Sequence, residues 1–122
     1  MEAEAKELAM ANAAQLLKDS QFIVDVFDNS SSLQTVKNYA DQTGISCIHA
    51  GLSSDYAEVI WNEVYRVPSD VNDDVCDYPL GRNLVMLTVA VACGAIVSLI
   101  AAGNKQNYSI TLKDLSVQSL NL

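Results

Sequence analysis

Positive charge is scarce in this chain of 122 residues, which has seven lysines and arginines against fifteen aspartates and glutamates. The formal net charge of −8 argues against a nucleic-acid backbone or an anionic membrane surface as a partner, because both repel an acidic protein. The same charge does not exclude a nucleotide that is held together with Mg²⁺.

Cysteine is scarce as well, and Cys47, Cys76 and Cys93 form an odd number at wide spacing. This pattern is not a disulfide framework. The first eighteen residues lack the continuous apolar core of a secretory signal. A reducing cytoplasm is therefore the expected location.

Half of the residues are apolar and 18% are charged, which is typical of a globular protein rather than a disordered one. The length suits one domain, and we expect residues 1–122 to form it. Residues 1–19 are rich in Ala, Leu, Glu and Lys with apolar residues at helical spacing, which predicts a first helix.

Residues 22–51 predict a parallel βαβ unit. The nearly continuous apolar run at residues 22–29 is typical of a strand buried on both faces. Ser31 followed by Gln34 fits a capping box for the next helix, which Gly44 would end. Residues 45–51 predict the second strand, and the short connections make the two strands parallel with a right-handed crossover.

The rest of the chain predicts antiparallel strands around one long helix. Residues 56–67 favour a longer, partly exposed strand, and residues 68–83 have the composition of a loop. Residues 108–120 favour two short strands with a turn between them. The expected class is α/β: a Rossmann-like partial domain with a parallel βαβ unit, antiparallel strands and a long buried apolar helix.

The helix is predicted by LVMLTVAVACGAIVSLIAAG, Leu84–Gly103, which is long enough to cross a membrane. Half of its residues are Ala, Gly, Ser, Thr or Cys, and no aromatic belt or basic cluster borders it. A helix that is apolar nearly all round can instead be the central helix of a core, so we expect it to be buried, with Cys93 inside. A second subunit could cover part of its surface, and a membrane span is the alternative.

Candidate chemistry begins at the carboxyl end of the first predicted strand, where ligands bind in open α/β sheets. Asp28 and Asn29 stand there, and a carboxylate in that position can hold Mg²⁺ beside the phosphates of a nucleotide. The alternative is that both residues only end the strand and lead into the helix cap. Asp25 lies within the strand, where a buried carboxylate needs a partner that the sequence does not identify.

The order of these segments resembles the second half of a ThiF/MoeB-type adenylyltransferase domain. The resemblance covers residues 16–120 and is carried by IVDVFDN, a helix, GISCIHAGL, the strand EVIWNE, a loop and the apolar helix. It implies an enzyme that uses ATP and Mg²⁺ to activate the C-terminal carboxylate of a small ubiquitin-like or sulfur-carrier protein. It also implies a homodimer or pseudodimer. The family's metal-binding and catalytic aspartate corresponds to Asp28, with Asn29 beside it at the cofactor.

The sequence departs from this family in two respects. Its five glycines form no G-x-G-x-x-G, so the phosphate-binding loop of the family's first half is absent. Leu33 stands where the family commonly has an arginine. The chain therefore resembles half of a site and would act as a homo-oligomer or with a missing N-terminal half. The alternative is a non-catalytic dimerisation or interaction module derived from the fold.

Other candidate residues point to weaker sites. Cys76 matches a loop that carries a catalytic cysteine in parts of the family, but its three aspartate neighbours would raise the pKa of its thiol. Cys47 and His49 lie two apart in a strand and therefore face the same side. They could bind a metal together with Cys76, they could belong to the core, or His49 could face the nucleotide or partner. The acidic segment at residues 70–81 lacks the glycine and glutamate of a calcium loop.

Overall fold

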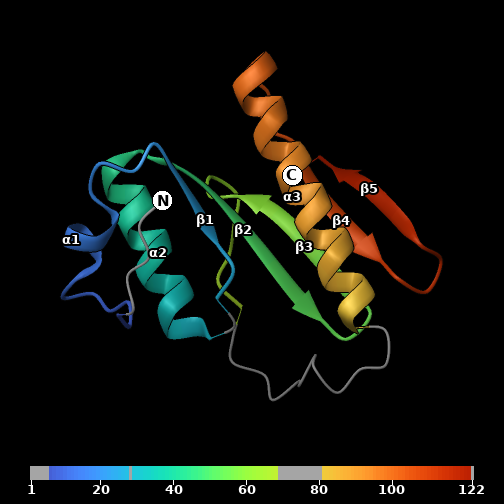
Figure 1. The fold of residues 1–122 in the computed structure, drawn as a ribbon, viewed down its shortest axis with the longest axis horizontal. Coiled ribbons are helices and arrows are strands. Elements are labelled where there is room, and N and C mark those ends of the chain that lie inside the picture. The colour runs from blue at the N-terminus through green and yellow to red at the C-terminus, as the bar shows by residue number, and fades with distance from the viewer. Residues whose placement is uncertain (1–5, 28, 69–80, 122) are drawn as a thin grey trace.

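A computed structural model describes residues 6–27, 29–68 and 81–121 of the chain. It contains a five-stranded sheet in the order β1-β2-β3-β4-β5 (Figure 1). The strands are β1 (Phe22–Asp25), β2 (Ser46–Ser53), β3 (Tyr56–Trp61), β4 (Asn107–Thr111) and β5 (Ser116–Leu120). The helices are α1 (Ala13–Leu17), α2 (Ser30–Thr43) and α3 (Gly81–Ala102).

The predicted βαβ unit is confirmed, because β1 and β2 are parallel and α2 connects them. The other three strand pairs are antiparallel, which gives the mixed α/β fold that the sequence predicted. The capping box was wrong: the N-cap of α2 is Asn29, whose side chain accepts a hydrogen bond from the Ser32 backbone N–H. Gly44 ends the helix in a left-handed conformation with φ of 72°, as predicted.

Three predicted elements are shorter in the structure. Among the described residues of the N-terminal segment, α1 is only five residues long. Asn12 accounts for part of this difference, because its side chain bonds the Ala9 N–H and the Glu7 carbonyl and so competes with helix formation. Strand β1 has four residues, and β3 ends at Trp61 because Asn62 begins a turn.

The two longer helices pack on opposite faces of the sheet. Neighbouring strand residues face opposite sides. Cys47 packs with Val36 and Ala40 of α2, whereas Ile48 packs with Ala92 and Ala95 of α3. Helix α3 contacts β2, β3 and β4, and α2 contacts β1 and β2. The buried cores therefore lie between the sheet and the inner side of each helix.

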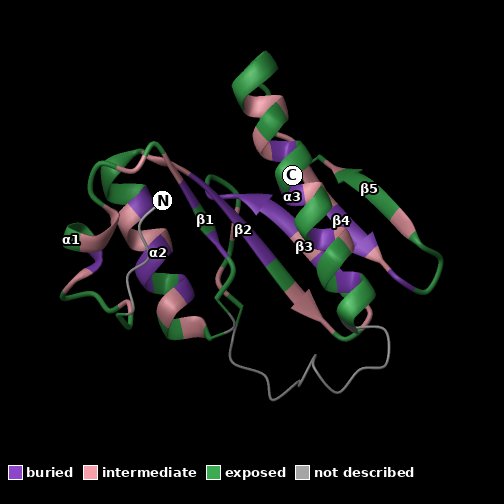
Figure 2. Ribbon diagram, in the orientation of Figure 1, coloured by how far each residue is buried: buried purple, intermediate pink, exposed green. Residues whose placement is uncertain are grey.

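The sequence predicted that β1 is buried on both faces and that α3 is buried on all sides. Both predictions were wrong, because each element has exposed residues (Figure 2). Val24 of β1 is 49% exposed, and β1 pairs only with β2 among the described strands. The segment Arg82–Ala102 is the one helix of the described residues with the length and composition of a membrane span, and its mean hydropathy is 2.6. Only its sheet-facing residues are buried, and Cys93 lies on the exposed side.

Candidate functional site

The predicted nucleotide site lies where β1 leads into α2. Asp28 is outside the described residues, so its predicted roles in catalysis, cofactor binding and metal binding stay predictions. Asn29 is described, and its Oδ1 atom lies 2.8 Å from the Ser32 backbone nitrogen. The Asn29 side chain is therefore occupied in capping α2. For Asn29, this agrees with the alternative interpretation, in which the residue only leads into the helix cap.

An open hollow of about 460 Å³ adjoins this first turn of α2. Its lining includes the hydroxyl residues Ser31, Ser32 and Thr35 and the amide residue Asn29. Hydroxyl groups and the backbone N–H groups at a helix N-terminus can hydrogen-bond a phosphate. No lysine or arginine of the described residues lines the hollow, and the acidic residue Glu7 does. The residues present thus fit a nucleotide in hydrogen-bonding capacity but not in charge.

A hydrogen bond holds the start of the predicted loop, residues 68–83, beside the first turn of α2. The Ser30 hydroxyl donates to the Pro68 carbonyl over 2.6 Å, so Pro68 lies beside the N-terminus of α2. Residues 69–80 follow and are outside the described part of the chain. The predictions for Cys76 and for the acidic segment therefore fall outside the structure.

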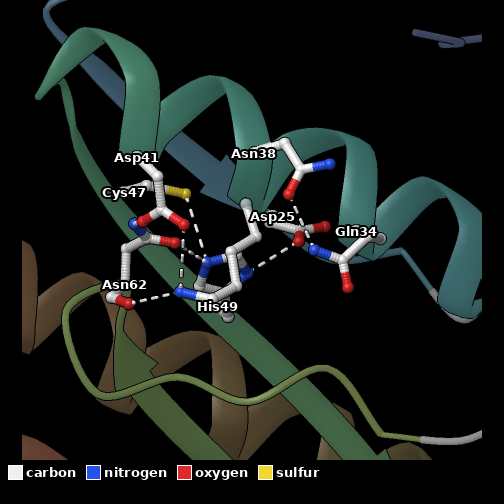
Figure 3. Close-up of polar contacts among 8 residues, drawn as sticks. Asp25, Gln34, Asn38, Asp41, Cys47, His49 and Asn62 are labelled. Carbon is white, nitrogen blue, oxygen red and sulfur yellow. Dashed lines mark hydrogen bonds and ion pairs between the residues drawn. The ribbon is translucent and has the colours of Figure 1, made fainter.

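A buried polar cluster lies at the end of β1 and contains the partner that Asp25 needs (Figure 3). Asp25 and His49 are directly opposite each other on β1 and β2, and both are 1% exposed. Asp25 Oδ2 lies 2.7 Å from His49 Nδ1. The other oxygen, Oδ1, accepts the Phe27 backbone N–H at 3.0 Å. Asp25 therefore ties His49 to the backbone at the exit of β1.

The other side of the His49 ring faces the amide of Asn62. Nε2 lies 2.9 Å from Asn62 Oδ1, while Asn62 Nδ2 donates to Asp41 Oδ1 over 2.7 Å. A carboxylate only accepts, so Asp41 fixes the orientation of the amide and leaves its oxygen toward His49. Asp25 Oδ2 and Asn62 Oδ1 are both acceptors, so each ring nitrogen faces an oxygen acceptor and a proton on both nitrogens is favoured. We infer that His49 is an imidazolium paired with the Asp25 carboxylate.

The cluster is closed from outside by Tyr65, whose ring stacks on His49 with centroids 3.7 Å apart and planes 4° apart. Burial and the nearby charges of Asp25 and Glu58 raise the pKa of Tyr65 to about 12. Tyr65 also lines a second open hollow, of about 430 Å³, between α2 and residues 63–67. Asp25 and His49 are each only 1% exposed, so a substrate cannot contact them in this structure. The cluster instead connects β1, β2, α2 and the turn at Asn62.

Cys47 lies in the same cluster, with its sulfur 3.6 Å from His49 Nε2. Burial, followed by the negative charge of Asp25, raises the pKa of its thiol to about 12. The thiol is therefore protonated at neutral pH and is neither a nucleophile nor a ready metal ligand. Among the described residues, no group of three potential metal ligands comes together.

The sequence predicted part of this arrangement. It placed Cys47 and His49 on one side of a strand, which is confirmed by their contact, and it identified Asp25 as a carboxylate in need of a partner. The idea that His49 faces a nucleotide or partner is wrong in this structure, because the ring is buried. Asn62 and Asp41 were missed, since only the fold brings residues from a turn and a helix to the strand.

Comparison with known proteins reveals the fold but no close relative. No protein-family model and no curated protein sequence matches the chain. Among solved structures, Escherichia coli MccB with MccA-N7isoASN superimposes with a TM-score of 0.65 at 14% identity. MccB with ATP superimposes with a TM-score of 0.62 at 14% identity. PaaA superimposes with a TM-score of 0.55 at 15% identity.

These similarities cover 97% of this chain but only 42% of MccB and 47% of PaaA. The chain thus spans about two fifths of the length of MccB. The fold is that of a partial ThiF-like domain, in agreement with the resemblance seen in the sequence.

Proposed function

We propose that this chain is the later half of an ATP-dependent adenylyltransferase that activates the terminal carboxylate of a small peptide or protein. One observation carries the proposal: the segment Asp25-Val26-Phe27-Asp28-Asn29 leaves a parallel strand and enters the N-terminus of α2 within a fold shared with MccB. MccB has been crystallised with ATP and, separately, with MccA. At 14% identity, these complexes support the proposal without assigning a substrate to this chain.

Each residue at the strand exit has a proposed role. Asp28 holds Mg²⁺, which when bound offsets the charge of the ATP phosphates during transfer of the adenylyl group. Asn29 caps α2 through the Ser32 N–H and so fixes the first turn of the helix, which would lie beside the nucleotide. Asp25 holds the exit of the strand through its bond to the Phe27 N–H, and His49 anchors Asp25.

The proposed site needs residues that this sequence does not contain. Neither a glycine-rich loop nor a basic cluster lines the hollow at the first turn of α2, and the chain spans 42% of MccB. β1 is an edge strand, because among the described strands it pairs only with β2. Further strands could extend the sheet along this edge. We propose that a further segment or a second polypeptide adds the phosphate-binding half there. A ubiquitin-like or sulfur-carrier protein is the proposed partner class, with a shorter peptide such as MccA as the alternative.

Isothermal titration with Mg-ATP tests this function. The chain should bind Mg-ATP once a complementing N-terminal half from a ThiF-like protein is added, and Asp28→Ala should abolish that binding. Asp114→Ala, at an exposed position in the β4–β5 turn, is the matched control and should bind normally. Absence of binding by the complemented chain, with the assembly verified by light scattering, would refute the proposal.

A second candidate function is a non-catalytic dimerisation or interaction module. The observation that favours it is the hollow at the first turn of α2, which has no lysine or arginine among its described lining residues. In this case the chain would bind a protein partner with no dependence on ATP, and Asp28→Ala would leave that binding unchanged. Partner binding measured with and without Mg-ATP separates the two functions.

A further inference from the structure

Residues 62–68 form a strap that covers the buried cluster and runs from the end of β3 to the first turn of α2. Little apolar burial holds this strap, because Glu63, Val64 and Arg66 are exposed and Tyr65 is only partly buried. An open hollow of about 430 Å³ lies between residues 63–67 and α2, so packed side chains do not support the strap on that side. Its polar contacts therefore decide whether it stays closed.

Two contacts of the strap are made with His49. Asn62 Oδ1 lies 2.9 Å from His49 Nε2 (Figure 3). The Tyr65 ring stacks on the imidazole with centroids 3.7 Å apart. The middle of the strap thus rests on the histidine. Side-chain contacts that do not involve the ring join the Asn62 carbonyl to Lys37, Glu63 to Lys105 and the Pro68 carbonyl to Ser30.

The contact with Asn62 depends on the charge of the ring. A neutral imidazole has one N–H, which the Asp25 carboxylate would keep on Nδ1. Nε2 would then present a lone pair to Asn62 Oδ1, and two acceptors would face each other. The amide cannot turn to offer its N–H, because its nitrogen donates to Asp41 and its oxygen would then face that carboxylate. Loss of one proton therefore turns this attraction into a repulsion.

The Cys47 thiol reinforces this effect. Its sulfur lies 3.6 Å from His49 Nε2, and its pKa is raised to about 12, chiefly by burial and next by Asp25, so it carries its proton at neutral pH. A thiol is a weak donor, and it could donate to the lone pair of a neutral ring. Nε2 would then have a new partner inside the core, whereas Asn62 Oδ1 would lose its donor. The strap, and not the ring, is therefore the part that is released.

The stacking of Tyr65 depends on the same charge. A cation over the face of an aromatic ring is attracted by the ring's electrons. Tyr65 itself stays neutral, because burial, followed by the charges of Asp25 and Glu58, raises its pKa to about 12. Once the imidazole is neutral, only dispersion holds the two rings together. Asn62 and Tyr65 would thus lose their attraction to His49 in one step.

The charged groups around His49 come from each element packed against it. Asp25 of β1 is the nearest, with Oδ2 2.7 Å from Nδ1. Each lysine in this region has a carboxylate of its own, so the charge of Asp25 is met by His49. The other charged groups are Lys37 and Asp41 of α2, Glu63 of the strap with its partner Lys105, and Glu58 of β3, which acts on Tyr65.

We propose that residues 62–68 are a proton-controlled strap, which is closed on the sheet while His49 is an imidazolium and is released when rising pH removes the ring proton. The closed strap binds this proton more tightly than the open one, so closure is lost as the pH rises. Pro68 ends the strap beside the first turn of α2, and the switch therefore adjoins the predicted nucleotide site. It stands whether or not the proposed adenylyltransferase function is correct.

NMR of the full chain tests the proposal, because His49 is the only histidine. The ¹⁵N shifts of its ring report protonation, and nuclear Overhauser contacts between its ring and that of Tyr65 report whether the strap is closed. We expect both to change with one midpoint as the pH rises, while circular dichroism shows that the chain stays folded. Asn62→Ala removes the acceptor at Nε2 and should lower the midpoint by about one pH unit.

Tyr65→Phe is the matched control, because it keeps a ring to stack and removes the phenol that ionises in base. It should release the strap at the same pH as the wild type. Ring contacts that persist after His49 has lost its proton would overturn the proposal. So would a release that disappears in Tyr65→Phe, or a ring that keeps both protons until the chain unfolds. The wild-type titration decides among these outcomes even if Asn62→Ala does not fold.

Discussion

Asp25 and His49 lie directly opposite each other on β1 and β2, with 2.7 Å between the carboxylate Oδ2 and the imidazole Nδ1. The pair is buried, and Asn62 closes the other side of the ring. Asp41 and Lys37 of α2 lie near the cluster, 3.5 Å apart, and the charge of Glu63 also acts on it. The Asn62 amide connects His49 to Asp41.

Removing one member of the pair should destabilise the fold strongly. Asp25→Asn leaves the imidazolium buried without its counter-charge, and we expect a loss of about 3–5 kcal/mol in the free energy of unfolding. Urea denaturation at neutral pH measures this loss. Asp114→Asn, an exposed control, should change stability by less than about 0.5 kcal/mol. A small effect of Asp25→Asn would mean that His49 is neutral in the folded protein.

The protonation of His49 can be observed directly, because it is the only histidine in the chain. We expect both ring nitrogens to carry a proton at neutral pH, since both face hydrogen-bond acceptors. Long-range ¹H–¹⁵N correlation spectra should show two nitrogens in the protonated range. A nitrogen with the shift of an unprotonated imidazole would show that the Asn62 amide is turned the other way.

The folded chain should lose stability in base. The pKa of the Cys47 thiol is raised from 9.0 to about 12, chiefly by burial and next by Asp25. Folding therefore favours the protonated thiol; this contribution is complete below pH 9 and is lost as the pH rises toward 12. Tyr65 acts in the same direction, with a pKa raised from 10.0 to about 12.

Urea denaturation from pH 7 to pH 11 measures this loss. The variant Cys47→Ala should be less stable at pH 7, because it leaves a cavity, but should lose less stability above pH 9. An unchanged slope in this variant would show that Cys47 does not contribute to the pH dependence.

The two described cysteines should differ sharply in reactivity. Cys93 is exposed on α3, whereas Cys47 is fully buried with a raised pKa. In a Cys76→Ser background, a maleimide should label Cys93 rapidly at pH 7, and Cys47 only after unfolding. Mass spectrometry identifies the labelled residue, and Cys93→Ser is the control. Labelling of Cys47 in the native protein would indicate that residues 62–68 open readily.

The sequence alone determined the order and type of most elements. Apolar runs broken by Gly44 and by polar turns predicted the βαβ unit, the apolar helix and the final strand pair, because hydrophobic periodicity and turn residues act locally. The sequence also showed that Asp25, a carboxylate within a strand, needs a partner. It could not show where β3 ends, because Val64 and Tyr65 have strand-forming side chains, yet a turn begins at Asn62.

The tertiary structure decided which residues meet. Asp25, Asp41, His49 and Asn62 are far apart in the chain, and only the parallel register of β1 and β2 and the position of α2 bring them together. Packing also decided that α3 buries one side only. Composition makes every side of that helix equally apolar, and only the sheet beneath it determines which side is covered and which side, with Cys93 and Gly94, is exposed.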